Sequence, residues 1–274
     1  MKKLTMLDYV KETPDVLRTN IEQYTTLVDP LMKELQQKEI KRILLVASGS
    51  SHNACYCARS FVEKVSGLEV RIITPYTFTY YENDIKETDL VLVVTQSGLS
   101  TNAIEALKII KKKQCRAICL TGNKNSDVKD VADVVIEYGV GEELVGYVTK
   151  GVSSLALFLD LFAIAYSGKT EYLEELKKAV HLNEEMIGKA TSFIQLHYKE
   201  FSSMSWVYSC GAGDNYGTAL ESALKMGETI HIPSCCYEIE EYIHGPNFQL
   251  TPQYNVIFFD GNDGASHRVE QVYK

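Results

Sequence analysis

Unbroken apolar segments that alternate with helix-like segments constrain the fold of this chain more than any other feature. Segments with helical spacing lie at 51–65 and 100–112. Strands that are apolar along their whole length are buried on both faces, which is typical of a parallel sheet covered by helices. The first half therefore predicts a doubly wound α/β domain. Five segments in it have strand character: 43–47, 69–74, 90–95, 116–120 and 133–137.

The same pattern begins again in the second half of the chain. Residues 206–215 resemble residues 44–53, because each segment reads as a strand, a turn of small residues and the start of a helix, with an offset of 162 positions. A further strand at 255–259 stands where the first half has the strand at 90–94. An offset of this size is that of a domain, so the sequence predicts a duplicated α/β unit.

We expect the first domain at 1–168, with an N-terminal helical segment, and a linker helix with the second domain at 169–274. The second unit ends early, since a helix beginning near Ala265 is its last predicted element. An incomplete parallel sheet leaves an exposed edge and an exposed apolar face. We therefore expect a truncated second unit, or one that a partner completes.

Composition excludes several classes of function. The formal net charge of -8 argues against a general nucleic-acid binder or a protein of anionic membrane surfaces. No N-terminal segment resembles a secretion signal, and we expect no apolar run long enough to span a bilayer, the nearest being 152–166 with Asp160 inside it. The seven cysteines lack zinc-site spacing, which indicates reduced cytosolic thiols. We expect a cytoplasmic protein without a bound metal.

A turn rich in hydroxyl groups follows the third predicted strand. Thr95, Gln96, Ser97, Ser100 and Thr101 lie where this strand gives way to a helix. The first N–H groups of a helix lack partners and the helix dipole favours negative charge, so such a turn can cradle an anion. The uncharged side chains add donors, which suits a phosphate monoester. An ordinary turn with Ser100 or Thr101 as the helix N-cap explains the same residues.

The second unit differs at the corresponding turn. Its strand at 255–259 is followed by Asp-Gly-Asn-Asp at 260–263. Two carboxylates at the beginning of a helix repel a phosphate. We therefore expect the first unit alone to keep the anion site.

Two further segments carry residues suited to proton transfer. Lys225 and Glu228 are three positions apart on a predicted helix and share a face, where the lysine can orient the carboxylate or form an ordinary surface ion pair. His244 precedes Gly245 and Pro246, so it ends a helical turn and is presented at a loop. It can serve there as a helix C-cap or as a proton shuttle.

Several motifs occur together in an order that resembles the sugar isomerase (SIS) family, and in particular the duplicated isomerase half of glucosamine-6-phosphate synthase. The resemblance extends from about Met6 to the C-terminus and includes the family's strand-to-helix turns. It therefore implies two SIS-type units. The motifs that carry it are Val-Lys-Glu-Thr-Pro at 10–14, Ser-Gly-Ser-Ser at 48–51, Thr-Gln-Ser-Gly at 95–98, Glu-Glu at 142–143 with Thr-Lys at 149–150, Ala-Leu-Lys at 223–225 and His-Gly-Pro at 244–246.

The resemblance implies roles for nine residues. Glu228 would move a proton between C1 and C2 of the sugar, with Lys225 beside it, while His244 opens the sugar ring. In the family this histidine, sixteen positions after the glutamate as here, enters the neighbouring subunit's site, which implies a homodimer. The residues implied to line the sugar-phosphate pocket are Ser50, Ser51, Thr95, Gln96, Ser97 and Ser100.

Departures from the synthase limit what the resemblance implies. The chain has Lys2 where the synthase has the nucleophilic cysteine of its glutaminase domain, and it lacks that enzyme's C-terminal lysine. We expect an isomerase without glutaminase activity and without a cofactor. Fructosamine-6-phosphate deglycases and amino-sugar-phosphate deaminases resemble the chain around Glu228 and His244, so both activities stay open. A regulatory module that binds sugar phosphate without turnover is a further alternative, although Lys225, Glu228 and His244 favour catalysis.

Overall fold

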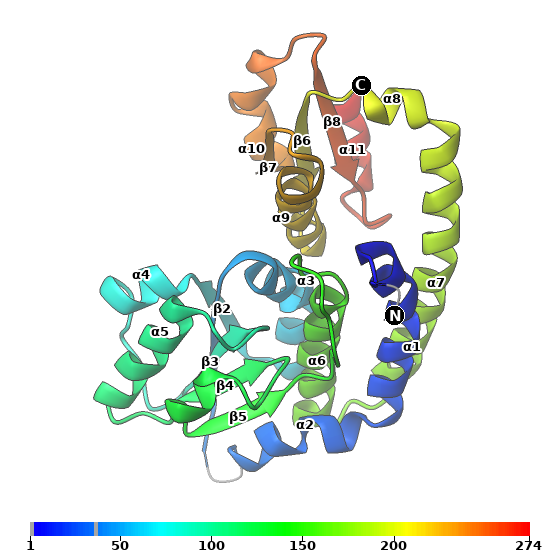
Figure 1. Ribbon diagram of the computed structural model, residues 1–274. Helices are drawn as coiled ribbons and strands as arrows, with labels where there is room; N and C mark the ends of the chain where they lie inside the picture. Colours follow the sequence, from blue (N-terminus) through cyan, green and yellow to red (C-terminus); the bar gives the residue numbers. More distant parts are fainter. Residues whose placement is uncertain (1–2, 36–37) are drawn as a thin grey trace. The chain divides into compact units, whose positions relative to one another are not determined.

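A computed structural model describes residues 3–35 and 38–274 and divides the chain into two compact units, Met1–Ile187 and Gly188–Lys274 (Figure 1). The division lies inside helix α7 (Tyr172–Leu196). We expected the domains to meet at residues 168 and 169, where helix α6 (Lys150–Ser167) ends at Gly168 in the left-handed conformation. Each unit contains a parallel sheet flanked by helices, as the apolar runs predict.

The sheet of the first unit has five parallel strands in the order β2-β1-β3-β4-β5. The central strands β1 and β3 are paired along their length, from Arg42 with Asp89 to Ala47 with Val94. The chain therefore runs outward in one direction from β1 to β2 and in the other from β3 to β5. The strands are β1 (Arg42–Ala47), β2 (Glu69–Ile73), β3 (Asp89–Thr95), β4 (Ile118–Thr121) and β5 (Val134–Glu137).

Helices cover both faces of this sheet because alternate residues of its strands point to opposite sides. On β1, Leu45 packs with α3 (Gly49–Ser66) and α6, whereas Val46 packs with the helices of the other face. Figure 1 shows α3 and α6 on one side of the sheet and α4 and α5 on the other. The remaining helical elements of this unit are α1 (Met6–Glu22), α2 (Tyr24–Lys33), α4 (Pro75–Tyr80), α5 (Thr101–Lys112) and the short 3₁₀ turn Asp127–Asp130.

Helix α6 is the central helix of the first unit. Its 18 residues have the length and hydropathy of a membrane span, contrary to our expectation that no apolar run is long enough. Its side chains are nevertheless packed inside the unit, and Leu155, Phe158 and Phe162 are fully buried. A helix that is apolar around its circumference suits such a buried position. We interpret α6 as a core helix.

The second unit has a three-stranded parallel sheet in the order β7-β6-β8. It repeats the arrangement of β2, β1 and β3, as the repeated sequence pattern predicts. The middle strand is buried from Val207 to Gly211, whereas every residue of β8 is partly exposed at the edge of the sheet. The elements are α8 (Tyr198–Ser202), β6 (Trp206–Gly211), α9 (Asp214–Lys225), β7 (Ser234–Glu238), α10 (Ile239–Ile243), β8 (Tyr254–Phe259) and α11 (Ser266–Tyr273).

Candidate functional site

A pocket lies at the carboxyl ends of β1 and β3 in the first unit, where the direction of the strand order reverses. Such a switch point is the usual ligand site of an open parallel sheet, because the loops that follow the two strands diverge there. The pocket encloses about 770 Å³ and is lined throughout by residues of the first unit. The six residues implied to bind the phosphate all line it: Ser50, Ser51, Thr95, Gln96, Ser97 and Ser100.

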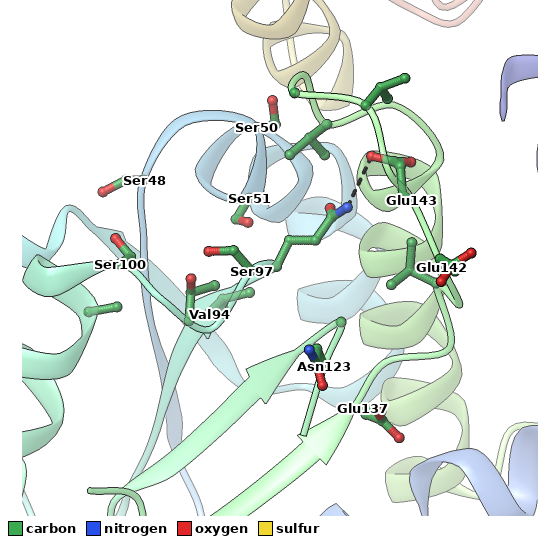
Figure 2. A pocket seen from close by; sticks show the side chains of 18 of the residues that line it. Ser48, Ser50, Ser51, Val94, Ser97, Ser100, Asn123, Glu137, Glu142 and Glu143 are labelled. Carbon is green, nitrogen blue, oxygen red and sulfur yellow. Dashed lines mark hydrogen bonds between the residues drawn. The ribbon is translucent and has the colours of Figure 1, made fainter. Parts of the chain in front are cut away.

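Two helices begin at this pocket with open N-termini. Ser48 and Ser100 occupy the N-cap positions of α3 and α5, but neither side chain caps its helix. The Ser100 hydroxyl instead donates to the Asn102 side chain, whose Nδ2 donates to Ser48 Oγ at 3.4 Å and so joins the two loops. Figure 2 shows these serines on one side of the pocket. Neither N-cap side chain thus takes a backbone donor of its helix, and helix starts of this kind favour an anion.

A third helix, α6, also begins at the pocket, but its N-terminus is closed by Glu143. The carboxylate accepts from Thr149 N at 2.8 Å through Oε1 and from Lys150 N at 2.8 Å through Oε2. Oε1 also accepts from Gln96 Nε2 at 3.0 Å, the dashed bond in Figure 2. Because a carboxylate already satisfies these donors, α6 offers no equivalent anion position. The pocket therefore has an open, hydroxyl-rich side and a side closed by its own carboxylate.

Helix α1 contacts the residues from 139 to 150 that form this closed side. Asn20 Nδ2 donates to Gly139 O at 3.1 Å, and Leu144 N donates to the Tyr9 hydroxyl at 2.9 Å. The motifs at 10–14 and 149–150, to which sequence reasoning assigned no role, meet there.

Lys150 makes the third of these connections to α1. Its side chain is 2% exposed, its Nζ lies 3.0 Å from Glu12 Oε1, and the same atom lies 5.2 Å from the centre of the Tyr9 ring. A buried ammonium group needs such partners to offset its loss of water.

Glycines allow the close packing of the site. A Cβ on Gly98 would lie 1.7 Å from Ser126 Oγ, and one on Gly151 would lie 1.8 Å from Gln96 Oε1. Gly98 also has a φ of +66°, a conformation that favours glycine. Sequence reasoning did not single out Gly151, because its requirement arises from Gln96, which is 55 positions earlier in the chain.

The predicted pair Lys225 and Glu228 is present in the second unit. Lys225 Nζ lies 2.6 Å from Glu228 Oε2 and 3.2 Å from Glu221 Oε1. Helix α9 ends at Lys225 and continues into a π-helical turn, Met226–Ile230, that carries Glu228. Such turns are frequent at functional sites. Glu228 also lines a second cavity of about 700 Å³, together with Cys235 and Cys236.

His244 lies at the end of α10, as its position before Gly-Pro predicts. It is exposed, occupies the C-cap position, and its Nδ1 lies 2.7 Å from Glu240 O. Its partner lies on its own helix, whereas Lys225 and Glu228 contact each other. The structure therefore brings the phosphate-binding candidates together in one pocket and places the three catalytic candidates in the other unit, with two of them in direct contact.

The acidic turn of the second unit uses its carboxylates internally. Asn262 N donates to Asp260 Oδ1 at 3.2 Å, and Ala265 N donates to Asp263 Oδ1 at 2.8 Å. Ser266 Oγ also donates to Asp260 Oδ1, at 2.6 Å. These carboxylates accept from donors of their own turn. That the first unit alone keeps an anion site stays a prediction.

Neither a metal centre nor a reactive thiol stands out. In residues 3–35 and 38–274, no three His, Cys, Asp or Glu side chains gather in a group that could hold a metal ion. The seven cysteines are free, and burial raises the pKa of Cys119, Cys210 and Cys236 to about 12. Those three thiols are protonated near neutral pH and are therefore poor nucleophiles.

Comparison with known proteins adds a family and an architecture. Residues 36–165 match the SIS domain family. A glutamine--fructose-6-phosphate aminotransferase (isomerizing) from Clostridium perfringens is 28% identical in an alignment of 255 positions that covers 88% of this chain and 42% of that protein. The chain spans less than half the length of this relative and of two similar aminotransferases.

Two solved structures share the fold over nearly the whole chain. A candidate phosphosugar isomerase from Clostridium difficile 630 has a TM-score of 0.86 and 26% identity, covering 98% of this chain and 79% of that one. The C-terminal domain of glucosamine-fructose-6-phosphate aminotransferase from Francisella tularensis has a TM-score of 0.84 and 23% identity, covering 99% and 80%. The two-unit α/β architecture is thus one found among phosphosugar isomerase structures.

Proposed function

We propose, from the match of residues 36–165 to the SIS domain family, that the protein is a sugar-phosphate isomerase that acts on a ketose phosphate or an amino-sugar phosphate. One observation carries the proposal: six hydroxyl and amide side chains line one pocket at the open N-termini of α3 and α5. Backbone and side-chain donors without a cationic side chain suit a phosphate monoester. We assign the phosphate to Ser50, Ser51, Thr95, Gln96, Ser97 and Ser100.

The proposed reaction moves a proton between C1 and C2 of the open-chain sugar. The Glu228 carboxylate removes a proton from one carbon, the electron pair forms the double bond between C1 and C2, and the carbonyl oxygen takes up a proton from solvent, which gives an enediol, or an enolamine for an amino sugar. The same carboxyl group returns the carbon-bound proton to the other carbon. The hydroxyl or amino group that forms the new C=O or C=N bond releases its proton to solvent, so the substrate is isomerised without loss of atoms. Lys225, in contact with Glu228 at 2.6 Å, orients the carboxylate.

We assign the opening of the sugar ring to His244, an exposed histidine at the end of α10. In the proposed arrangement this residue enters the site of a neighbouring subunit, which makes the protein a homodimer. We also propose that both units are SIS-type and that the protein is cytoplasmic, with no glutaminase activity.

The test is incubation of the protein with fructose 6-phosphate, glucosamine 6-phosphate and fructoselysine 6-phosphate, followed by product analysis. Isomer formation without release of an amine supports the proposal. Release of ammonia or lysine, in which water replaces the amine at the sugar carbon, identifies a deaminase or a deglycase instead. Binding without any product identifies a regulatory module and contradicts the enzyme proposal.

Two variants distinguish loss of the assigned base from a general loss of folded protein. Glu228→Gln keeps the shape of the side chain and removes its ability to take a proton, so we expect turnover to fall by about two orders of magnitude or more. Glu270→Gln, at an exposed position of α11, is the matched control and should retain turnover. Unchanged turnover in Glu228→Gln would exclude this residue as the base.

A further inference from the structure

We propose that Glu143 and Tyr138 are positioning residues for Gln96, which fix its side-chain amide so that a ligand in the pocket meets an N–H donor at this position. The inference rests on the proposed function for the identity of the ligand, a phosphorylated sugar. It concerns two residues outside the set that the motifs assign to binding. Its basis is a chain of hydrogen bonds that leaves the amide one orientation.

The chemistry of the two partners decides this orientation. A carboxylate accepts hydrogen bonds, so the NH₂ group of Gln96 faces Glu143 Oε1, at 3.0 Å. The Tyr138 hydroxyl donates to Gln96 Oε1 at 3.1 Å from the other side. Burial, and then the nearby Glu143 charge, raise the pKa of Tyr138, so its hydroxyl keeps its proton and remains a donor. Both ends of the amide are therefore assigned.

This arrangement leaves one N–H of Gln96 for a ligand. An amide NH₂ has two donors, and Glu143 takes one of them. Gln96 is half-buried and lines the pocket. The second donor has no partner among the recorded contacts of the described residues. A phosphate oxygen or another acceptor of the sugar phosphate can complete it.

Hydrogen bonds also fix the Glu143 carboxylate, so it can orient the Gln96 amide. Thr149 N and Lys150 N each donate to its carboxylate at 2.8 Å, at the positive end of the α6 dipole. The carboxylate therefore cannot turn away from Gln96 without breaking these bonds. The space for the Gln96 amide is also fixed, because Gly151 presents no Cβ where Gln96 Oε1 lies.

The variant Glu143→Leu tests the orientation. It removes both carboxylate oxygens, so the Tyr138 hydroxyl, which can donate or accept, remains as the partner of the Gln96 amide. The Gln96 amide can then turn over. The turned amide presents its carbonyl oxygen to the pocket, where it repels a phosphate oxygen. We expect the affinity for glucosamine 6-phosphate to fall by about tenfold or more.

Two measurements on the purified protein decide the inference. Calorimetric titration with glucosamine 6-phosphate compares the wild type, Glu143→Leu and Tyr138→Phe. Nuclear Overhauser effects between the Gln96 NH₂ protons and the Tyr138 ring, measured without ligand, report the orientation of the amide. We expect these effects to be stronger in Glu143→Leu than in the wild type. Unchanged effects overturn the inference even if affinity falls, as does unchanged affinity.

The double variant Gln96→Glu with Glu143→Gln separates positioning from stability. It exchanges the two groups, so that the carboxylate now at position 96 can accept from both the amide at position 143 and the Tyr138 hydroxyl. We expect the melting temperature to return toward that of the wild type while binding stays weak, because the donor to the ligand is gone. Full recovery of binding overturns the inference. If the wild-type protein binds none of the sugar phosphates, the proposed function fails, and the ligand-free spectra still test the amide orientation.

Discussion

The side-chain amide of Gln96 occupies the space that a Cβ on Gly151 would need, with Oε1 1.8 Å and Cδ 2.6 Å from that position. Gly151→Ala must therefore displace Gln96. We expect a loss of sugar-phosphate affinity of about tenfold or more, with a change in unfolding free energy of about 1–3 kcal/mol from overpacking. Calorimetric titration and chemical denaturation measure the two effects.

Gly146→Ala is the matched control for this prediction. Gly146 lines the same pocket, but a Cβ there would meet no atom within 4 Å. It should bind the sugar phosphate like the wild type. Equal affinity in Gly151→Ala and Gly146→Ala would contradict the role given to Gln96.

The anion site predicts a strong effect of a negative charge at Ser97. Ser97→Asp places a carboxylate among the donors proposed for the phosphate, so two anions would compete for one position. We expect binding of a phosphate ester to become undetectable in calorimetric titration. Ser203→Asp, an exposed position in the second unit, adds the same charge elsewhere and should bind normally. Retained affinity in Ser97→Asp would place the phosphate outside this loop.

The buried pair of Arg42 and Asp89 predicts an acid dependence of the first unit. Burial opposes ionisation of Asp89, but hydrogen bonds from Arg42 and from Lys86 N outweigh it and lower the pKa of this carboxyl from its usual 3.8. Because the folded state lowers the pKa, the stabilisation is present above pH 3.8 and is lost as the pH falls through the folded-state value.

Asp89→Asn should remove most of this contribution. The Asp89 side chain is 1% exposed, and removal of one member of a buried pair costs about 3–5 kcal/mol. Hydrogen exchange of peptides from β1 and β3 measures the loss. The single tryptophan, Trp206, lies in the second unit and provides an internal control by fluorescence. If the hydrogen-exchange protection of β1 and β3 falls with decreasing pH to the same extent in Asp89→Asn and in the wild type, this assignment is contradicted.

Glu12 and Lys150 predict that α1 stabilises the closed side of the pocket. Glu12→Gln leaves the buried ammonium of Lys150 without its carboxylate, at a cost of about 1–3 kcal/mol, since Glu12 itself is 45% exposed. Faster hydrogen exchange at 139–149 would report the loosened segment. Lys150→Met removes the buried positive charge. The double variant Glu12→Gln with Lys150→Met should therefore lower the unfolding free energy by less than the sum of the two single variants. Strict additivity would show that the pair is not coupled.

The proposed dimer predicts recovery of activity in mixed subunits. Glu228→Gln and His244→Ala should each be inactive alone. If His244 serves the neighbouring site, a mixed dimer contains one site with both residues intact, and random mixing should recover about a quarter of the wild-type turnover. Mixing after reversible dissociation, followed by an activity assay, tests this. No recovery despite confirmed subunit exchange would place both residues in sites of one chain.

Much of the fold could be predicted from periodicity. β1 and β3 are continuous apolar runs, and their burial on both faces produces that pattern. Helix α4 (Pro75–Tyr80) was not predicted, because six residues are too few to show helical spacing. Its start carries a local signal, since Thr74 is its N-cap and Pro75 its first residue.

Part of the candidate site could also be predicted from the sequence, and part could not. Ser97 and Ser100 could be identified because a strand, a hydroxyl-rich turn and a helix follow one another in the sequence. Glu143 could not be given a role, since its partner Gln96 is 47 positions away. The contact of Tyr9 with Leu144 spans 135 positions and leaves no local pattern. Such relationships arise from tertiary packing.

The most direct measurement compares the binding of glucosamine 6-phosphate and of glucosamine to the wild-type protein by calorimetric titration. The hydroxyl-rich loops at the starts of α3 and α5 should make the phosphate indispensable. We predict saturable one-site binding of the phosphorylated sugar and no detectable heat from glucosamine. Equal binding of the two sugars, or binding of neither, would contradict the assignment of this pocket to a sugar phosphate.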